Sequence, residues 1–331
     1  MIANVAVLGT GSIGMRHLNA LRALPSLQTY AIPVRPTKLN ELRDSGYATC
    51  ADLAEATRQG VKALIIATDT SRHVDDALGA LRLGLNVLVE KPLAVDANEA
   101  GRLRAATRTA GRKVHVGCVL RFSESLRLFR EWLPRAGRLH SIHVECRSYL
   151  PDWRPDSPYQ QSYSARKNEG GVMRDLIHEI DYASWLFGWP TALQARLRNL
   201  GRLQIESEEI AELSWETTDG AVLSMDLDYL SKPPRRAMRA FGERGTLKLD
   251  GIAQKLLWLP ADGSSDREEK RFSQTRDEML RAQDQAFLRA CGGEKEQTQL
   301  VDLEDGIRAM SICDAARAAS DSGCEQKIKY A

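Results

Sequence analysis

Long apolar runs are absent from this sequence. The longest, such as residues 63–67 and 86–89, fall far short of the ~18 residues that a membrane-spanning helix needs. The first basic residue is Arg16, so no basic segment precedes an apolar one and we expect no signal peptide. The sequence therefore predicts a protein with no membrane partner.

An excess of charge of either sign is also absent. Lys and Arg number 46 against 44 Asp and Glu, which leaves a net charge of +2. A dedicated nucleic-acid binder would normally carry a strong basic excess, and a disordered acidic chain the opposite. We therefore expect a globular protein without a nucleic-acid partner.

Cysteines are few, and no two of them have the spacing of a C-x-x-C motif. The 331 residues hold six cysteines and no C-x-x-C pair. A chain of this length can bury a core without disulfides or metals. We expect reduced thiols in a cytoplasmic protein, and we predict no metal site.

The first third of the chain alternates strand and helix. Short apolar runs bounded by polar segments of helical spacing predict buried parallel strands joined by right-handed crossovers. The expected strands are 3–8, 29–34, 63–68, 86–90 and 113–119, and the expected helices are 15–24, 39–45, 75–83 and 97–109. This pattern indicates a doubly wound α/β sheet.

The pattern changes near residues 120–123. Residues 142–147 and 223–229 alternate apolar and polar side chains, as strands of an antiparallel sheet with one covered face do. Helices are expected at 124–132, 172–187, 276–290 and 305–319. We predict a first domain of residues 1–121 and an α+β domain of residues 122–331 with an open, mainly antiparallel sheet.

A glycine-rich turn follows the first strand. Gly9, Gly11 and Gly14, with Ser12 and Ile13, form G-x-G-x-x-G between an expected strand and an expected helix. In that context the glycines allow a tight turn, close approach to a pyrophosphate, and close helix packing. The first domain is therefore predicted to bind a dinucleotide.

The end of the second strand is basic. An NAD site normally has an acid about 20 residues past the glycines for the ribose 2′-hydroxyl. Here no acid precedes Glu41, and Arg35 and Lys38 follow the strand. Basic side chains suit a 2′-phosphate, so we favour NADP, with NAD as the alternative if these residues form only a solvated loop.

Two further motifs combine residues suited to proton transfer. Lys91 follows Glu90 at the end of the fourth strand, the edge where ligands bind in open parallel sheets. Asp175 and His178 lie in a segment of helical spacing. A carboxylate raises the pKa of a neighbouring imidazole and fixes its orientation. The alternative for this pair is a buried contact that only joins structural elements.

These motifs, in this order, resemble the Gfo/Idh/MocA oxidoreductases, the glucose–fructose oxidoreductase and inositol dehydrogenase group. The resemblance covers nearly the whole chain. It implies a Rossmann domain, NAD(P), and a homodimer or homotetramer formed through the open sheet. It assigns Lys91, Asp175 and His178 to catalysis. It also adds Thr68, Thr70, His73 and Glu90 to the cofactor site. The motifs that carry the resemblance are Gly9–Gly14 with Arg16-His17, Ala67-Thr68 with His73, Glu90-Lys91-Pro92, Gly170-Gly171 with Asp175, His178 and Asp181, and Gly242-Glu243 with Gly245-Thr246.

One departure from the family pattern affects the second motif. The family's Asp and His are further apart, and one residue is missing between Asp175 and His178 here. We favour His178 as the acid/base and Asp175 as its partner or as a ligand of a substrate hydroxyl.

Aromatic and basic residues surround this motif in the sequence. Aromatic faces stack on sugar rings and arginine holds phosphates, so these residues are candidates for substrate binding. The candidates are Arg121, Trp153, Arg154, Tyr163 and Lys167. The alternative is a surface loop with incidental charge.

The leading hypothesis is an NAD(P)-dependent dehydrogenase or reductase of a sugar, polyol or sugar nucleotide in carbohydrate metabolism. Lys91 and the Asp175/His178 pair would transfer the proton. A non-catalytic NAD(P)-binding regulator on the same scaffold, or a reductase of a non-sugar cyclic ketone or imine, are the alternatives, because fold alone does not separate them.

Overall fold

The chain forms two compact units. The computed structural model describes residues 2–263, 265–295 and 297–330. The first unit takes the chain up to Phe122 together with Thr275–Met310, and the second comprises Ser123–Gln274 and the chain from Ser311 onwards. This division differs from the predicted continuous domains, 1–121 and 122–331, because segment 275–310 packs with the first unit.

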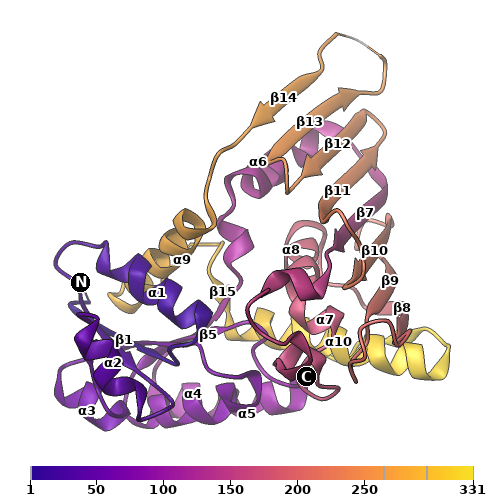
Figure 1. Cartoon of the computed structure of the whole chain (residues 1–331). Helices are drawn as coiled ribbons and strands as arrows, with labels where there is room; N and C mark the ends of the chain where they lie inside the picture. Colours follow the sequence, from indigo (N-terminus) through magenta and orange to yellow (C-terminus); the bar gives the residue numbers. More distant parts are fainter. Residues whose placement is uncertain (1, 264, 296, 331) are drawn as a thin grey trace. The chain divides into compact units, whose positions relative to one another are not determined.

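The first unit is built on a parallel sheet (Figure 1). Among the described residues its strand order is β15-β6-β5-β4-β1-β2-β3, with only β15 antiparallel. The order reverses between β1 and β4, as in a Rossmann fold. The strands are β1 (Asn4–Leu8), β2 (Gln28–Ile32), β3 (Ala48–Thr49), β4 (Ala63–Ile66), β5 (Asn86–Glu90), β6 (Val114–Gly117) and β15 (Val301–Asp302).

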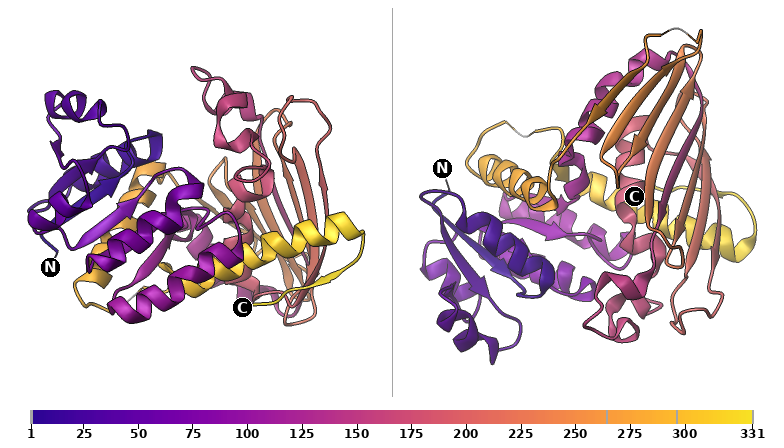
Figure 2. Two further views of the ribbon diagram at one scale, coloured as in Figure 1. Left: turned by 90° about the horizontal axis from the view of Figure 1, so that it is seen from below. Right: turned by 45° about the horizontal axis from the view of Figure 1, so that its top comes forward.

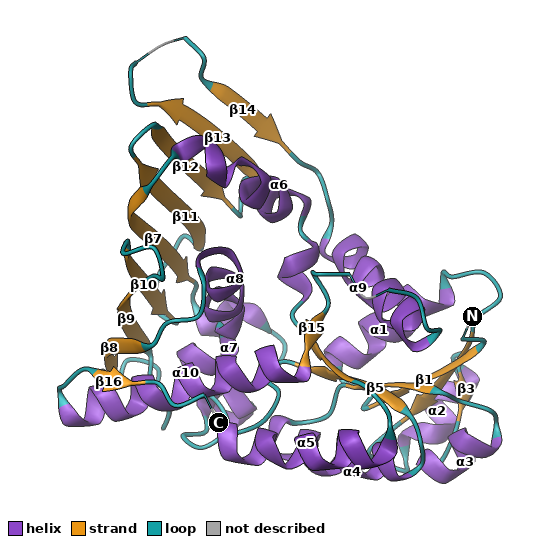
Figure 3. Ribbon diagram, turned by 180° about the vertical axis from the view of Figure 1, so that it is seen from behind, coloured by secondary structure: helices purple, strands orange, loops and turns teal. Residues whose placement is uncertain are grey.

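Helices cover both faces of this sheet. Helices α4 and α5 lie side by side on one face, and α1 and α9 on the other (Figure 3). The helices and 3₁₀ turns of this unit are α1 (Ser12–Arg22), α2 (Lys38–Asp44), α3 (Leu53–Arg58), η1 (Thr70–Arg72), α4 (His73–Arg82), α5 (Ala97–Ala110), η2 (Val119–Phe122) and α9 (Arg276–Cys291). Sheet and helices together confirm the predicted doubly wound architecture.

Apolar side chains explain why segment 275–310 joins the first unit. Phe287 of α9 is fully buried in the same core as Val7 of β1 and Leu18 of α1. Leu280 packs with Ala20 of α1 and Val119. The last strand of the sheet, β15, pairs with β6 and belongs to the same segment.

The second unit contains one large, mainly antiparallel sheet (Figure 2). Its order in the described residues is β14-β13-β12-β11-β7-β10-β9-β8-β16, and the β7–β10 pair is parallel. This sheet confirms the predicted α+β architecture. The strands are β7 (Leu139–Arg147), β8 (Ala192–Arg198), β9 (Ile210–Glu216), β10 (Val222–Asp228), β11 (Arg235–Gly242), β12 (Gly245–Asp250), β13 (Lys255–Pro260), β14 (Glu268–Arg271) and β16 (Gln326–Lys327).

The two faces of this sheet differ. Ile142, Val144 and Cys146 of β7 are buried beneath the helical layer. The helices and 3₁₀ turns of this unit are α6 (Glu124–Trp132), η3 (Leu133–Ala136), η4 (Leu150–Trp153), η5 (Tyr159–Gln161), η6 (Tyr163–Ala165), α7 (Val172–Asp175) and α8 (Ile177–Phe187); α10 (Leu303–Ser322) begins in the first unit and ends in the second.

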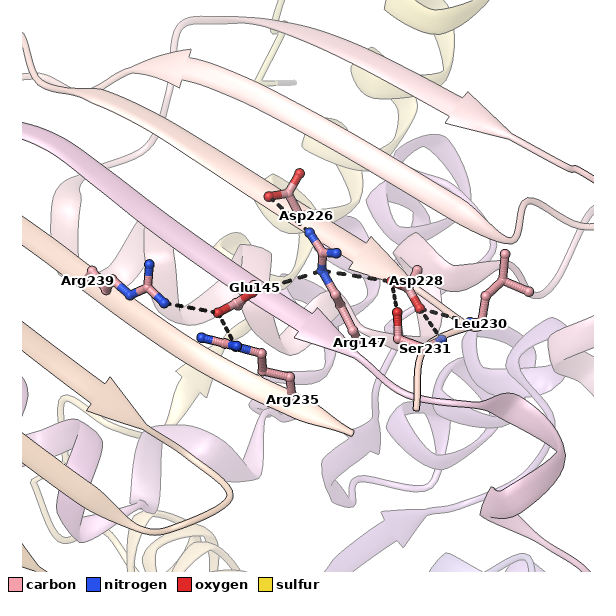
Figure 4. A network of polar contacts seen from close by, with 8 residues as sticks. All are labelled: Glu145, Arg147, Asp226, Asp228, Leu230, Ser231, Arg235 and Arg239. Carbon is pink, nitrogen blue, oxygen red and sulfur yellow. Dashed lines mark hydrogen bonds and ion pairs between the residues drawn. The ribbon is translucent and has the colours of Figure 1, made fainter. Parts of the chain in front are cut away.

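The opposite face of the sheet carries a charged network (Figure 4). Glu145 Oε1 lies 2.6 Å from Arg235 Nε and 3.6 Å from Arg239 Nη2. Arg147 lies 3.6 Å from Asp226 and 3.8 Å from Asp228. Acids and bases therefore alternate across three neighbouring strands, β11, β7 and β10.

The predicted helix 172–187 is wrong in one respect. Leu176 has φ −96° and ψ 27°, so the segment is two helices, α7 and α8. The interruption falls between Asp175 and His178, where the sequence is one residue shorter than the family pattern.

Two global features concern the membrane and the cysteines. No helix in the described part of the chain combines the length and apolar character needed to cross a membrane. None of the cysteines forms a disulfide within the described residues.

Candidate active site

The glycine loop connects β1 to α1 at the point where the strand order reverses. Gly9 has φ +93°, and a Cβ there would lie 2.5 Å from the Ala67 carbonyl oxygen after β4. A Cβ on Gly14 would lie 1.9 Å from the Gly9 carbonyl oxygen. At both positions only glycine fits, because the loop, the helix and the β4 end are in contact.

Gly11 is different. A Cβ at Gly11 would meet nothing within 4 Å, and Gly11 is the N-cap of α1, whose first turn includes Ser12 and Ile13 and no acidic residue. The first N–H groups of a helix have no partner within the helix and attract anions. The loop can therefore accept a phosphate group against its backbone.

The next two strand ends lie on the same edge of the sheet. Thr68 and Thr70 follow β4, and Lys91 follows β5 directly. The peptide bond between Lys91 and Pro92 is cis. The Thr68 hydroxyl donates to Asp76 (2.8 Å), and Thr70 is buried.

His73 is tied to the backbone on both sides of its ring. Nδ1 lies 2.8 Å from the Pro92 carbonyl oxygen, and Nε2 lies 3.0 Å from the Thr68 carbonyl oxygen. Burial lowers the pKa of His73, while the two carbonyl groups act in the opposite direction. Both ring nitrogens thus face protein atoms of the two loops, and the place of His73 in the cofactor site stays a prediction.

Glu90 at the end of β5 is tied to a second buried histidine. His17 Nε2 lies 3.1 Å from Glu90 Oε1, and His17 Nδ1 lies 2.9 Å from Asp284 of α9. Burial disfavours the charged ring, but the two carboxylates outweigh it and raise the pKa of His17 to about 10. Burial raises the pKa of Asp284, and the His17 charge opposes that shift.

The end of β2 is open to solvent. Arg35 is exposed and Lys38 half-buried. A backbone hydrogen bond of 3.0 Å from Lys38 to the Arg35 carbonyl oxygen closes the turn between them. Both side chains are accessible to an anion at this end of the strand.

In the second unit, two tyrosines lie close to the Asp175 carboxylate. The Tyr229 hydroxyl donates to Asp175 Oδ2 at 2.5 Å, and Tyr163 is near enough for Asp175 to raise its pKa. Burial and Asp175 raise the pKa of Tyr229 well above its usual range, and Asp175 and burial do the same for Tyr163. Both hydroxyls therefore keep their protons and remain donors.

His178 lies in the first turn of α8, beyond the interruption at Leu176. It is buried, like Asp175, with 9% of its surface exposed. Tyr182, four residues further along α8, lies close to Glu179, Arg236 and Cys146.

The aromatic and basic segment lies against the Asp175 cluster. The Trp153 ring packs edge-on to Tyr229 with 5.4 Å between centroids, and it is 38% exposed. Arg154 is exposed and close enough to Tyr163 to oppose the rise in its pKa, and Lys167 is exposed. An accessible indole and an accessible guanidinium therefore lie beside a buried carboxylate.

Arg121 has another environment. It is 1% exposed and lies 3.2 Å from Asp305 Oδ2, within the first unit. The guanidinium thus joins the end of β6 to the start of α10, a contact that the sequence did not reveal, and substrate binding by Arg121 stays a prediction.

Sequence reasoning missed three residues of these networks. Tyr229 had been noted only as part of an alternating strand, and His17 only as part of a motif. Asp284 lies 267 residues after His17, so no local pattern could connect them.

Comparison with known proteins gives matches to both halves of the chain. Residues 3–118 match the model described as an oxidoreductase family with an NAD-binding Rossmann fold. Residues 134–248 match the GFO/IDH/MocA C-terminal domain. Together the two models match well over half of the chain.

Individual relatives have low sequence identity to this chain, but the similarity extends over two thirds or more of both chains. The rhizopine catabolism protein MocA of Rhizobium meliloti is 28% identical, with 94% of this chain and 93% of that protein covered. Inositol 2-dehydrogenase 2 of Saccharopolyspora erythraea is 28% identical, with 69% of this chain and 67% of that protein covered. The WlbA dehydrogenase of Bordetella pertussis, solved with NADH and UDP-GlcNAcA, has a TM-score of 0.84 at 20% identity, with 99% and 98% of the chains covered. This last likeness shows a common fold.

Proposed function

Because this chain belongs to the Gfo/Idh/MocA family of NAD-binding oxidoreductases, we propose that it transfers a hydride between a nicotinamide cofactor and a ring carbon of a sugar, polyol or sugar nucleotide. The observation that carries the proposal lies within the first unit. The glycine loop occupies the switch point between β1 and β4, and Lys91 follows β5, the next strand on the same edge. Ligands of open parallel sheets bind at this edge.

The residues present fit a dinucleotide. Gly9 and Gly14 allow loop, helix and strand to touch, while Gly11 leaves its backbone open to a phosphate. When bound, the nicotinamide supplies the acceptor or donor of the hydride. The protein supplies binding, orientation and proton transfer.

The choice between NADP and NAD rests on the end of β2. Arg35 and Lys38 are accessible there, and no acid precedes Glu41 to bind a ribose 2′-hydroxyl. An exposed arginine can form charge-assisted hydrogen bonds with a phosphate. We therefore favour NADP.

The proton chemistry is assigned to three residues. The Lys91 ammonium stabilises the negative charge that develops on the substrate oxygen. His178 accepts the hydroxyl proton in oxidation and returns it in reduction. Asp175 orients the site and contacts a substrate hydroxyl, with its carboxylate held at Oδ2 by the hydrogen bond from Tyr229.

The surroundings of Asp175 favour a sugar-type substrate. The exposed face of Trp153 can stack on a sugar ring, and Arg154 with Lys167 can bind an anionic group such as the diphosphate of a sugar nucleotide. Inositol 2-dehydrogenase 2 is named for a polyol, and the WlbA dehydrogenase was solved with the sugar nucleotide UDP-GlcNAcA.

The test begins with the protein as purified. Small molecules that remain bound through native purification are identified by mass, and then sugars, polyols and sugar nucleotides are screened for absorbance change at the nicotinamide band. Turnover that Lys91→Ala abolishes supports the proposal. Cofactor binding without turnover of any such substrate contradicts it and favours a regulator or a reductase of a non-sugar compound.

A further inference from the structure

Two buried histidines contact the residues on either side of Lys91. The carboxylate of Glu90, the preceding residue, contacts the His17 ring, and the carbonyl of Pro92, the following residue, contacts the His73 ring. His17 is 0% exposed and His73 is 2% exposed. Neither contact is made by Lys91 itself, so both act on the strand end that carries it.

The His17 contact favours a charged ring. Both ring nitrogens lie within hydrogen-bond distance of carboxyl groups, Glu90 on β5 and Asp284 on α9, and an ionised carboxylate only accepts. A neutral imidazole has one N–H, whereas the imidazolium has two and satisfies both acceptors. These two carboxylates are the charged groups that act on His17, which therefore carries a buried positive charge between two negative ones.

Neighbouring backbone leaves the Glu90 carboxylate little freedom. A Cβ on Gly117 of β6 would lie 2.5 Å from Glu90 Oε1, so a side chain there would displace the carboxylate. Glu90 is thus held from one side by His17 and confined from the other by the β6 backbone.

The His73 contact joins two loops at the same edge. One ring nitrogen faces the Pro92 carbonyl after β5 and the other faces the Thr68 carbonyl after β4. With its lowered pKa the ring is neutral and has one N–H, so His73 donates to one of these carbonyl oxygens and contacts the other, and it lies between the segment that follows Lys91 and the loop beside the glycine turn.

We propose that His17 and His73 are positioning residues that clamp the backbone on both sides of Lys91, and that His17 does so as a buried cation held between Glu90 and Asp284. This inference rests on the proposed function for the role of Lys91. It also gives a role to α9, because this helix supplies Asp284, the second acceptor that keeps the His17 ring in place.

A third buried histidine provides the matched control. His115 of β6 is 1% exposed, lies in the same unit, and has Nδ1 3.3 Å from the Val301 carbonyl oxygen. It contacts neither neighbour of Lys91 in the interactions described. His115→Gln therefore measures what a buried histidine contributes to stability alone.

The experiment compares His17→Gln, His73→Gln and His115→Gln in the full chain. For the first two we expect kcat to fall by about 10²-fold, the effect of misplacing a reacting group by about an ångström, with KM and cofactor affinity unchanged. His115→Gln should lower the melting temperature but not kcat. If His17→Gln does not fold, Asp284→Asn, which keeps the side-chain size, takes its place.

Charge supplies a readout that a purely structural role would not change. His17→Gln leaves Glu90 and Asp284 without the cation between them, which adds one net negative charge beside Lys91. The alkaline limb of the kcat profile should move to higher pH, and the double variant His17→Gln/Asp284→Asn should move it back.

A second readout needs no turnover. In protein with isotope-labelled histidine, one ring should keep the imidazolium signature well above the usual histidine pKa of about 6.5, and that signal should vanish in His17→Gln. A parent enzyme without NAD(P)-linked turnover contradicts the proposed function, whereas this spectrum still tests the buried cation. Titration of His17 near its usual pKa, or equal kcat in all three variants of an active parent, overturns the clamp.

Discussion

Asp175 and His178 are three residues apart and have different surroundings. The Asp175 carboxylate accepts a hydrogen bond from Tyr229 at Oδ2 and lies close to Tyr163, and both tyrosines have raised pKa values and keep their protons. Protonating such a carboxylate would weaken the acceptor that the Tyr229 hydroxyl uses. This environment favours Asp175 as an orienting anion and leaves proton transfer to His178.

Three substitutions should therefore damage activity unequally. Lys91→Ala and His178→Ala should each lose about 10²–10⁴-fold in kcat, the usual contribution of a positioned acid or base, and His178→Ala should flatten the pH–rate profile. Asp175→Asn should lose less, because the amide keeps the shape and one acceptor. Steady-state kinetics against pH measures all three.

Cofactor titration is the control for these variants, since the glycine loop is untouched and binding should persist. If His178→Ala keeps the parent's pH profile while Asp175→Asn is inactive, the two roles are exchanged. If all three match the parent, the reacting groups are elsewhere.

The cofactor preference can be tested at Arg35. Removing its guanidinium should weaken NADP about tenfold to a hundredfold, the value of one charge-assisted hydrogen bond, and leave NAD almost unaffected. Fluorescence titration of both reduced cofactors against Arg35→Ala measures the difference. Equal weakening of the two would contradict a 2′-phosphate site.

At the scale of elements, local patterns and distant contacts were predictable to different degrees. The glycine turn and the helices on 97–109 and 124–132 follow from apolar spacing and turn residues, and the structure has them within a residue. The break at Leu176 left no such signal, because apolar residues continue at helical spacing through it.

Non-local packing explains why the unit to which α9 belongs could not be predicted. α9 was expected as a helix, yet nothing in its sequence tells whether its apolar face covers the first sheet or the second. The answer depends on Phe287 and Leu280 fitting a core built largely from residues between Val5 and Phe122, far earlier in the chain. The Asp175–Tyr229 contact was likewise hidden, because each residue was read within its own element.

The start of α9 makes a stability prediction. Thr275 and Glu278 form a reciprocal capping box, with Glu278 accepting from the Thr275 N–H at 2.7 Å. Thr275→Ala should lower the free energy of unfolding by about 0.5–2 kcal/mol. Urea unfolding without cofactor measures the loss.

Thr37 offers a matched control, because it is the N-cap of α2 but makes no capping hydrogen bond with its side chain. Thr37→Ala should change stability much less. Equal effects of the two substitutions would mean that the box contributes nothing beyond a threonine at the N-cap.

At the scale of the whole molecule, the charged face of the second sheet bears on assembly. We propose that a second copy of the chain covers this face, forming a homodimer or a homotetramer. The alternating acids and bases of Figure 4 suit a self-complementary interface that weakens as salt rises. Sedimentation velocity at micromolar concentration should show an oligomer at low salt.

Glu145→Lys should shift this equilibrium towards monomer, because the new cation faces Arg235 and Arg239. Glu294→Lys, an exposed position of the first unit, is the matched charge reversal and should leave assembly unchanged. A parent that sediments as a clean monomer would refute the proposed interface.

The discontinuous first unit also sets an order on protein synthesis. His17 leaves the ribosome 267 residues before Asp284, and the whole second unit up to Gln274 emerges between them. Nascent chains usually fold their N-terminal domain first. Here the first sheet must wait with part of its core uncovered, so a ribosome that stalls before α9 would release a chain whose first unit lacks Phe287, Leu280 and Asp284.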